Sequence, residues 1–448
     1  MFAGLLKKEI HAPLNSSVIL GVNDKKSLIV DESNENILLI GSPRSGKGVS
    51  TVIPSALVFE GTSFFLDQKG EIFKATSDYR EKILNHEILL FNPFSNNTDT
   101  LRWNPLNEIR FTDEYLTSDL RIISCAVISN KTNTATTEAA RNLFEALILL
   151  AFHNNAKKKW GIPSLVDLLS FFNDGVLVLQ EDILCDIKKS DYITADYLEV
   201  LNNYIVINDY TYRKEVSSII YSDILFVNNT FFQKNLTISD FSINDLFHRN
   251  TKVSFYFCFD IAHYYDCSVL ANIFFSQLYS RLSLRNTDSW EKDKDKRYLI
   301  ILDEFFTINK ISNMGTFLRS AKEHCTKTII VCHNVEFLKR IYSPSDSEVE
   351  NRDFCSKNNI LSNCDKYLLY PGHYISNMTL KFYLFVLCGY YNNKPSIQSL
   401  SEEEILALPI TKIIIYDKCS SNFTIADKFL HYKSKWCSER LNFNLDMG

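Results

Sequence analysis

The sequence predicts an α/β protein with a parallel central sheet that is interrupted by an all-helical insertion. Three observations lead to this prediction. An apolar strand runs directly into a Gly-rich loop and a helix in ENILLIGSPRSGKGVS (35–50), and a second apolar strand ends in an acidic pair in YLIILDEFF (298–306). Between them, the apolar residues of 111–240 follow helical spacing. Strand, loop, helix and strand in succession are typical of a parallel sheet covered by helices.

The composition is that of an ordinary globular protein. The chain has 448 residues, of which 46% are hydrophobic and 23% are charged, and its length suggests two or three domains. The net charge of −5 excludes a chain that is basic throughout. Any contact with nucleic acid must therefore come from local basic patches.

Cysteine usage and apolar runs indicate the compartment. The 11 cysteines include no Cys-x-x-Cys pair and no cluster with zinc spacing, and scattered thiols favour a reducing cytosol. The longest apolar runs, ALILLAF (146–152) and FYLFVLCGYY (382–391), are shorter than the roughly 18–20 residues that span a bilayer. The N-terminal apolar stretch is too short for a signal peptide. We expect this chain by itself to be soluble.

Residues 1–110 are predicted to form the first part of the α/β domain. After the strand ENILLIG (35–41) and its loop, GVSTVIPSALVF (48–59) is expected to be a helix that Pro54 bends or ends early. Two more strands are expected in TSFFLDQKGEIF (62–73) and EILLFNPF (87–94).

The insertion is predicted to cover residues 111–240 and to be all-α. In TTEAARNLFEALILLAFHNN (136–155) one helix face is formed by Ala139, Leu143, Ala146, Leu147 and Leu150. The segment contains 11 basic and 17 acidic side chains, a net charge of −6 that accounts for the negative sign of the whole chain.

Residues 241–448 are predicted to return to the α/β domain and complete it. Strands are expected in TKVSFYFCFD (251–260), KRYLIILDEFF (296–306), TKTIIVCHN (326–334), KYLLYPG (366–372) and KIIIYD (412–417).

The Gly-rich loop has the pattern of a P-loop, in which backbone N–H groups and a helix N-terminus surround the phosphates of a nucleotide. Lys47 would neutralise the terminal phosphates of ATP. The predicted nucleotide-binding residues are Gly41, Ser42, Pro43, Arg44, Ser45, Gly46, Lys47, Gly48 and Val49. The alternative is an ordinary strand-to-helix turn that contains a lysine.

The acidic pair after the second strand decides between these readings. Asp303 at a strand end is placed to organise Mg²⁺, and Glu304 to polarise an attacking water, as in a Walker B motif. The two motifs together predict a nucleotide site, although either one alone is common. Gly48 stands where a P-loop has Ser or Thr, and Ser50 is expected to point elsewhere. Mg²⁺ would then be held by Asp303, phosphates and water.

These motifs resemble those of the TraG/TraD-type coupling ATPases of type IV secretion and conjugation systems. The family's Arg-Ser-Gly-Lys-Gly-Val loop and following Ile-Pro are matched by 44–49 and 53–54, so the glycine after the lysine is a family habit. LDQKGEIF (66–73) resembles Leu-Asp-Pro-Lys-Gly-Glu-Leu. Further matches are FNPF (91–94), RWNPL (102–106), LDEF (302–305) and LSEEEILALP (400–409).

The resemblance implies a RecA-like ring motor, expected to be a homo-hexamer that binds ATP and Mg²⁺ between subunits. By position, Lys47 would hold phosphates, Asp303 the metal, and Glu304 would be the catalytic base. Arg319 would stabilise transition-state charge in a neighbouring subunit, unless it is only a surface residue of an amphipathic helix. The implied partners are a relaxase complex or effector proteins, components of the secretion channel, and DNA.

Two features depart from the family pattern. His333 stands where the family usually has a Gln that senses the γ-phosphate, and it either replaces that donor or is a histidine without a role. The family typically begins with membrane-spanning helices and lies at the cytoplasmic face of the bacterial inner membrane, whereas this sequence starts almost where those helices would end.

The cargo is not fixed by the sequence. The basic cluster Lys157–Lys159 beside Trp160 is small and also fits a solvated loop, and an acidic insertion fits protein cargo better than nucleic acid. Two other functions stay open. One is a cytosolic DNA translocase or packaging ATPase. The other is a receptor that uses the nucleotide fold as a scaffold without hydrolysis, which Gly48 and His333 would explain.

Overall fold

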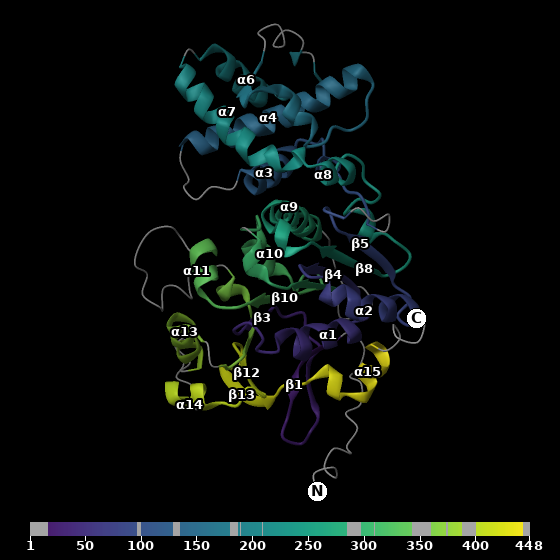
Figure 1. Ribbon diagram of the computed structural model, residues 1–448, viewed down its shortest axis with the longest axis vertical. Coiled ribbons are helices and arrows are strands. Elements are labelled where there is room, and N and C mark those ends of the chain that lie inside the picture. The colour runs from purple at the N-terminus through teal and green to yellow at the C-terminus, as the bar shows by residue number, and fades with distance from the viewer. Residues whose placement is uncertain are drawn as a thin grey trace.

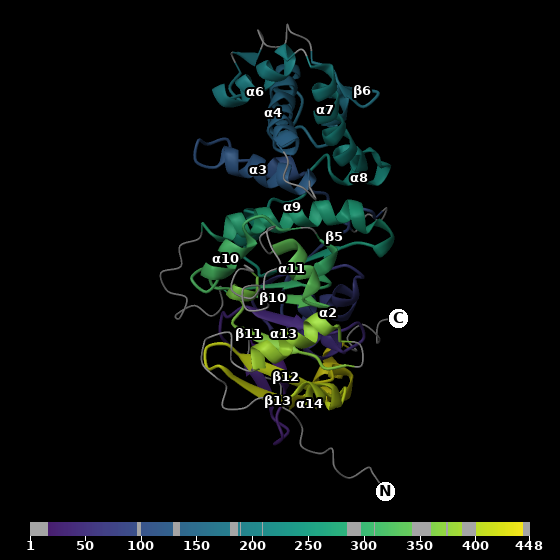
Figure 2. The same ribbon diagram turned by 90° about the vertical axis from the view of Figure 1, so that its left-hand side faces the viewer.

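The computed structural model describes residues 17–95, 100–128, 135–179, 187–188, 190–207, 209–284, 297–308, 310–342, 360–372, 375–387 and 400–441. The molecule is elongated. A body built around one large sheet occupies one end. The helices α4 (Ala135–Lys158), α6 (Ala195–Val206) and α7 (Tyr210–Ile224) lie at the other end, beyond α9 (Tyr264–Leu282) (Figures 1 and 2).

The sheet of the body has eleven strands in the order β2-β1-β13-β12-β11-β3-β10-β9-β4-β8-β5. The seven from β11 to β5 are parallel to one another, whereas β12, β13, β1 and β2 extend one edge with antiparallel pairings. The strands are β1 Val18–Val22, β2 Leu28–Asp31, β3 Ile37–Ile40, β4 Thr62–Asp67, β5 Glu87–Phe91, β8 Val253–Cys258, β9 Tyr298–Leu302, β10 Thr326–Cys332, β11 Lys366–Leu369, β12 Lys412–Asp417 and β13 Asn422–Asp427.

Helices cover both faces of this sheet. Alternate residues of β3 divide between two hydrophobic clusters: Leu38 and Ile40 face a cluster that includes α9 and α10, while Ile37 and Leu39 face one that includes α1 and α2. The central strands are therefore apolar on both faces, which is why they read as continuous apolar runs. The helices are α1 Ile53–Val58, α2 Glu71–Lys82, α9 Tyr264–Leu282, α10 Met314–Ser320, α11 Glu336–Tyr342, α13 Asn377–Leu387, α14 Glu402–Ala407 and α15 Lys435–Leu441.

Three features of the body differ from the sequence prediction. The strand expected over 62–73 ends at Asp67, because Gly70 adopts a left-handed conformation and starts α2. The strand KIIIYD pairs antiparallel on both sides, so the sheet is only mostly parallel. The edge strands β1, β2 and β13 were not predicted.

The helix after the Gly-rich loop is irregular in its first turn. Gly48–Val52 form a π-helical turn, and regular α-helix begins only at Ile53. Pro54 lies in the first turn of the α-helical part, where a proline needs no N–H donor. The helix was predicted to be bent or ended early by Pro54. It is not ended there, and Pro54 instead lies just after the change from π-helix to α-helix.

Among the described residues between β5 and β8, the regular structure is helical apart from one short hairpin. Its helices are α3 Leu116–Val127, α4 Ala135–Lys158, α6 Ala195–Val206, α7 Tyr210–Ile224 and α8 Thr230–Asn235. The exception is a hairpin of two-residue strands, β6 Phe172–Asn173 and β7 Val176–Leu177, so the segment is not strictly all-α. The middle of α4 is buried all round, from Leu143 to Phe152.

The two chain crossings between body and helical segment run side by side. Arg102 N donates to a carboxylate oxygen of Asp240 at 2.7 Å, and Asp240 N donates to Arg102 O at 2.9 Å. The same two strands of chain are also joined by a hydrogen bond from Trp103 N to Asn235 O. None of the helices in the described part of the chain combines the length and the apolar composition that a bilayer crossing requires.

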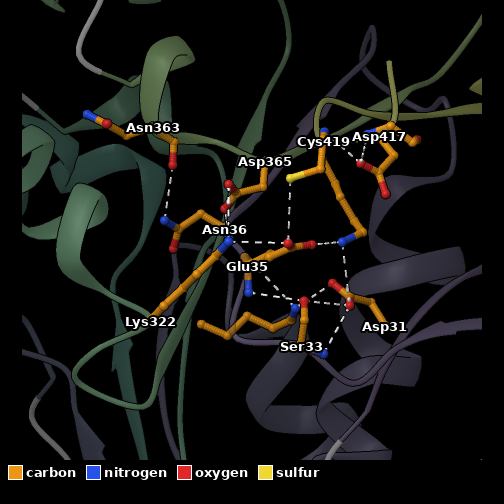
Figure 3. A network of polar contacts seen from close by, with 12 residues as sticks. Asp31, Ser33, Glu35, Asn36, Lys322, Asn363, Asp365, Asp417 and Cys419 are labelled. Carbon is orange, nitrogen blue, oxygen red and sulfur yellow. Dashed lines mark hydrogen bonds and ion pairs between the residues drawn. The ribbon is translucent and has the colours of Figure 1, made fainter. Parts of the chain in front are cut away.

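A polar network lies at the edge of the sheet where β3, β10 and β11 begin (Figure 3). The buried Lys327 of β10 donates to Asp31 at 2.6 Å, and Lys366 of β11 contacts both Asp31 and Glu35. Two carboxylates and a thiol, of Glu35, Asp365 and Cys419, bring ligand atoms within 4.8 Å of one another. Ammonium groups already balance these carboxylates, since Lys322 lies 3.2 Å from Glu35 and 3.5 Å from Asp365. The cluster is an ion-pair network that links β10 and β11 to Asp31 at the end of β2 and to Glu35 before β3.

Candidate nucleotide-binding site

The predicted site residues follow the carboxyl ends of three adjacent strands. The Gly-rich loop follows β3, His333 follows β10, and Asp303 follows β9, and these strands are neighbours in the order β3-β10-β9. Asp67 ends β4, the next strand along. Ligands of open α/β sheets bind at this edge. The tertiary structure thus brings together two motifs that lie far apart in the sequence.

Tight backbone packing holds the Gly-rich loop in its shape. Gly41 N donates to Cys332 O at 3.2 Å, and a Cβ at Gly41 would lie 2.4 Å from the Cβ of Tyr370, so only glycine fits there. Arg44 and Gly46 have positive φ angles of 61° and 92°. Pro43 and Arg44 are exposed at the tip of the loop.

Lys47 lies inside the curl of the loop. Its Nζ donates to Gly41 O at 2.5 Å and to Ser42 O at 3.1 Å. Burial lowers the pKa of Lys47, while the charges of Glu304 and Asp303 act in the opposite direction. The ammonium group is therefore close to the acidic pair and occupies the space that the loop encloses.

The helix start offers room but no hydroxyl group. A Cβ at Gly48 would meet no atom within 4 Å. The hydroxyl groups of Ser50 and Thr51 are instead 2.9 and 2.8 Å from the hydroxyl of Tyr370, so the expectation that Ser50 points elsewhere is confirmed. The Ser45 hydroxyl is buried, and it has no hydrogen-bond partner within the described residues. It is the only loop hydroxyl with this property in that part of the chain.

Asp303 has the electrostatics of a cation ligand. Burial raises its pKa to about 7, with further contributions from the negative charges of Glu304 and Asp67. Three carboxylates thus lie at one edge of the sheet and repel one another. A divalent cation would offset this repulsion. Carboxylate oxygens are the ligands that Mg²⁺ takes in proteins, so these residues fit this metal.

Glu304 is held by two basic side chains. Its Oε2 lies 2.8 Å from Nε2 of His333, and its Oε1 lies 3.8 Å from Nζ of Lys69. Burial acts to raise the pKa of Glu304, but His333, Lys69 and Lys47 outweigh burial and lower it. Glu304 is therefore a carboxylate at neutral pH. The His333 ring also packs against Phe306, with ring centroids 4.4 Å apart.

Arg319 does not join this group. It is exposed on α10, and the carbonyl of the preceding residue Leu318 accepts a hydrogen bond of 2.7 Å from Asn36, at the amino end of β3. Arg319 therefore lies at the opposite edge of the sheet from Lys47. Within one chain it cannot reach the loop.

Four residues near the two motifs were not predicted from the sequence. Lys69 and Gln68 lie in the LDQKGE motif, which carried a resemblance but no assigned role, and Gln68 Nε2 is buried without a partner in the described part of the chain. Lys428 and His431 contact the loop and its helix from the C-terminal region. No motif marks these two residues, so no signal in the sequence could have identified them.

Residues 5–360 match the family described as Type IV secretory system Conjugative DNA transfer. The chain belongs to this family. The likeness to the TraG/TraD-type coupling proteins inferred from the motifs is thereby confirmed.

Individual relatives support the assignment. The chain is 25% identical over 322 residues to the conjugal transfer protein TraG of Escherichia coli, covering 68% of this chain and 49% of TraG. It is 25% identical over 346 residues to the protein VirD4 of Rhizobium radiobacter, covering 75% of this chain and 46% of VirD4. The chain thus spans about half the length of the curated relatives it matches.

Solved structures identify the fold. The plasmid coupling protein TrwB bound to the ATP analogue ADPNP aligns with a TM-score of 0.64 and 14% identity, over 89% of this chain and 86% of TrwB. TrwB with ADP and Mg²⁺ aligns with a TM-score of 0.63 and 14% identity, over 88% and 85%. The fold is therefore the α/β nucleotide-binding fold of TrwB, consistent with a RecA-like P-loop ATPase.

Proposed function

We propose that this protein is an ATP-hydrolysing coupling protein that delivers cargo to a type IV secretion or conjugation channel. The observation that carries the proposal is the convergence of Lys47, His333 and the Asp303–Glu304 pair at three adjacent strand ends. Family membership and the nucleotide complexes of TrwB support the same conclusion.

Each residue has a distinct role in the proposed reaction. The backbone N–H groups of the loop and Lys47 bind the phosphates of ATP, whose oxygens replace the carbonyls that Lys47 now contacts. Asp303 would hold Mg²⁺, which supplies charge neutralisation at the phosphates. Glu304 accepts the proton of the attacking water, and His333 and Lys69 orient its carboxylate.

Arg319 belongs to a second subunit's site in this proposal. A residue exposed at the far edge of the sheet completes a nucleotide site only when another copy of the chain presents it. A head-to-tail ring, here a homo-hexamer, provides that arrangement because each subunit contributes one face to the next.

The cargo follows from the helical segment. Its net charge of −6 over 111–240 opposes direct binding of phosphates, which favours protein cargo such as a relaxase or an effector over bare DNA. DNA would then be moved as part of a relaxase complex. The place of action is the cytoplasmic face of the inner membrane.

The test compares ATP hydrolysis by the assembled oligomer for the wild type, Lys47→Ala and Glu304→Gln. We expect both variants to lose at least about a hundredfold in kcat, while Glu304→Gln still binds ATP because the phosphate contacts remain. Lys82→Ala, an exposed lysine at the end of α2, is the matched control. Equal, near-zero rates in the assembled wild type and both variants would refute hydrolysis and leave the scaffold receptor.

A further inference from the structure

One carbonyl in the helix after the loop lacks a donor from the helix itself. In the π-helical turn, Ile53 N donates to Gly48 O, five residues back. The next donor in this register would be residue 54, which would reach Val49 O. Residue 54 is a proline and has no N–H. Val49 O therefore needs a partner from elsewhere in the fold.

His431 supplies that partner. It lies after β13, at the start of the short helix His431–Lys433, and its Nδ1 is 2.7 Å from Val49 O. A carbonyl oxygen only accepts hydrogen bonds, so Nδ1 must carry the hydrogen. Burial lowers the pKa of His431, which keeps the ring neutral in this tautomer at pH 7.

Lys428 binds the loop itself. Its Nζ donates to Ser45 O at 2.8 Å and also to Ile410 O, and it lies 5.0 Å from the centre of the Tyr370 ring. The lysine is buried, with 8% of its surface exposed. Burying an ammonium group costs free energy. Its hydrogen bond to the loop backbone indicates that this cost serves to hold the loop in one shape.

The contact with Ser45 O determines where the loop's N–H groups point. Ser45 C=O and Gly46 N–H belong to one planar trans peptide, so they point in opposite directions. Gly46, with φ of 92°, is the residue at which this peptide could rotate at little cost. The hydrogen bond from Lys428 to Ser45 O therefore also fixes the direction of the Gly46 N–H, which points away from Lys428.

We propose that Lys428 and His431 are positioning residues that hold the phosphate-binding loop and its helix in the conformation that accepts a nucleotide. The C-terminal region, far from both motifs in sequence, thereby sets the affinity for the phosphates. This inference rests on the proposed nucleotide function.

The experiment measures binding of a fluorescent ATP analogue with Mg²⁺ and hydrogen exchange of the ligand-free protein. Lys428→Met is expected to raise the dissociation constant about tenfold, with kcat at saturating ATP within about twofold of wild type. Exchange should accelerate only in residues 41–53. Lys428→Arg, which keeps a charged donor, should recover most of the affinity. Lys433→Met, exposed in the same segment, is the matched control.

A second pair of variants tests His431. His431→Phe removes the donor and should weaken binding, whereas His431→Asn, whose amide lies near the position of Nδ1, should restore it. This pair carries the test if Lys428→Met does not fold. Unchanged affinity and exchange in Lys428→Met or His431→Phe, with Lys47→Ala clearly impaired, would overturn this inference alone. If Lys47→Ala also binds normally, the proposed nucleotide function fails instead.

Discussion

At the scale of single residues, charge compensation explains both the site and the sheet. Glu304 lies between His333 and Lys69, and this pairing keeps a half-buried carboxylate ionised. His333, which stands where the family pattern predicts a glutamine, is therefore paired with Glu304. On the opposite edge, Asp31 and Lys327 form a buried pair that serves stability and not catalysis.

Stability should depend on the ionisation of Asp31. Burial acts to raise its pKa, but Lys327, Lys366 and Ser33 outweigh burial and lower it from the ordinary value of 3.8. Because the pKa is lower in the folded state, the stabilisation is present at pH values above the unfolded-state pKa of 3.8 and is lost as the pH falls through the folded-state pKa. Asp31→Asn should reduce the unfolding free energy by about 3–5 kcal/mol at pH 7, since it leaves Lys327 buried without its partner.

Urea unfolding at pH 7 and at pH 3 checks this prediction. The difference between wild type and Asp31→Asn should be smaller at pH 3. Asp24→Asn, in the exposed turn between β1 and β2, should match wild type at both values. An equal difference at the two pH values would show that the charge of Asp31 is not the cause.

At the scale of elements, the helix after the loop combines two helical types. The π-helical turn Gly48–Val52 and the α-helix from Ile53 meet one residue before Pro54, and the Val49 carbonyl that Pro54 cannot reach accepts a hydrogen bond from His431. The Ile-Pro pair thus does more than mark the family, because it has a physical consequence for the helix. It creates a position at which another part of the fold can bind the helix.

Pro54→Ala should make the His431 contact partly redundant. Alanine restores an N–H that can reach Val49 O, so His431→Phe should weaken nucleotide binding less in the Pro54→Ala background than in wild type. A double-mutant cycle on the dissociation constant measures this coupling, expected to be about 1 kcal/mol. Strictly additive effects would show that Val49 O is not the shared acceptor.

At the scale of the whole molecule, one chain holds only part of the proposed catalytic site. Lys47 and the acidic pair lie at the carboxyl edge of the sheet, and Arg319 lies at the amino edge. The helical segment extends from the body on the far side of α9 (Figure 2). The proposed ring joins the two edges of neighbouring copies, and its activity is then a property of the assembly.

Mixing two inactive variants tests this arrangement. Arg319→Ala alone should lower kcat by about 10³-fold or more, as expected for a trans-acting arginine. When mixed in equal amounts with Lys47→Ala, random assembly gives an intact Lys47 next to an intact Arg319 at about a quarter of the sites, so about a quarter of wild-type activity should return. The double variant Lys47→Ala/Arg319→Ala, mixed with Arg319→Ala, should restore none. No recovery in the first mixture would show that Arg319 is only a surface residue and does not complete the site of a neighbouring subunit.

The sequence by itself determined the P-loop, the Asp-Glu strand end and the helical character of the middle segment, because each is a local pattern of glycine, charge or apolar spacing. The motifs in the sequence were also sufficient to predict the family. Only the tertiary structure decided the strand order that puts His333 between the two motifs, the antiparallel edge, and the reach of Lys428 and His431 to the loop. Those contacts join residues more than 380 positions apart, and the packing that creates them leaves no periodic trace in the chain.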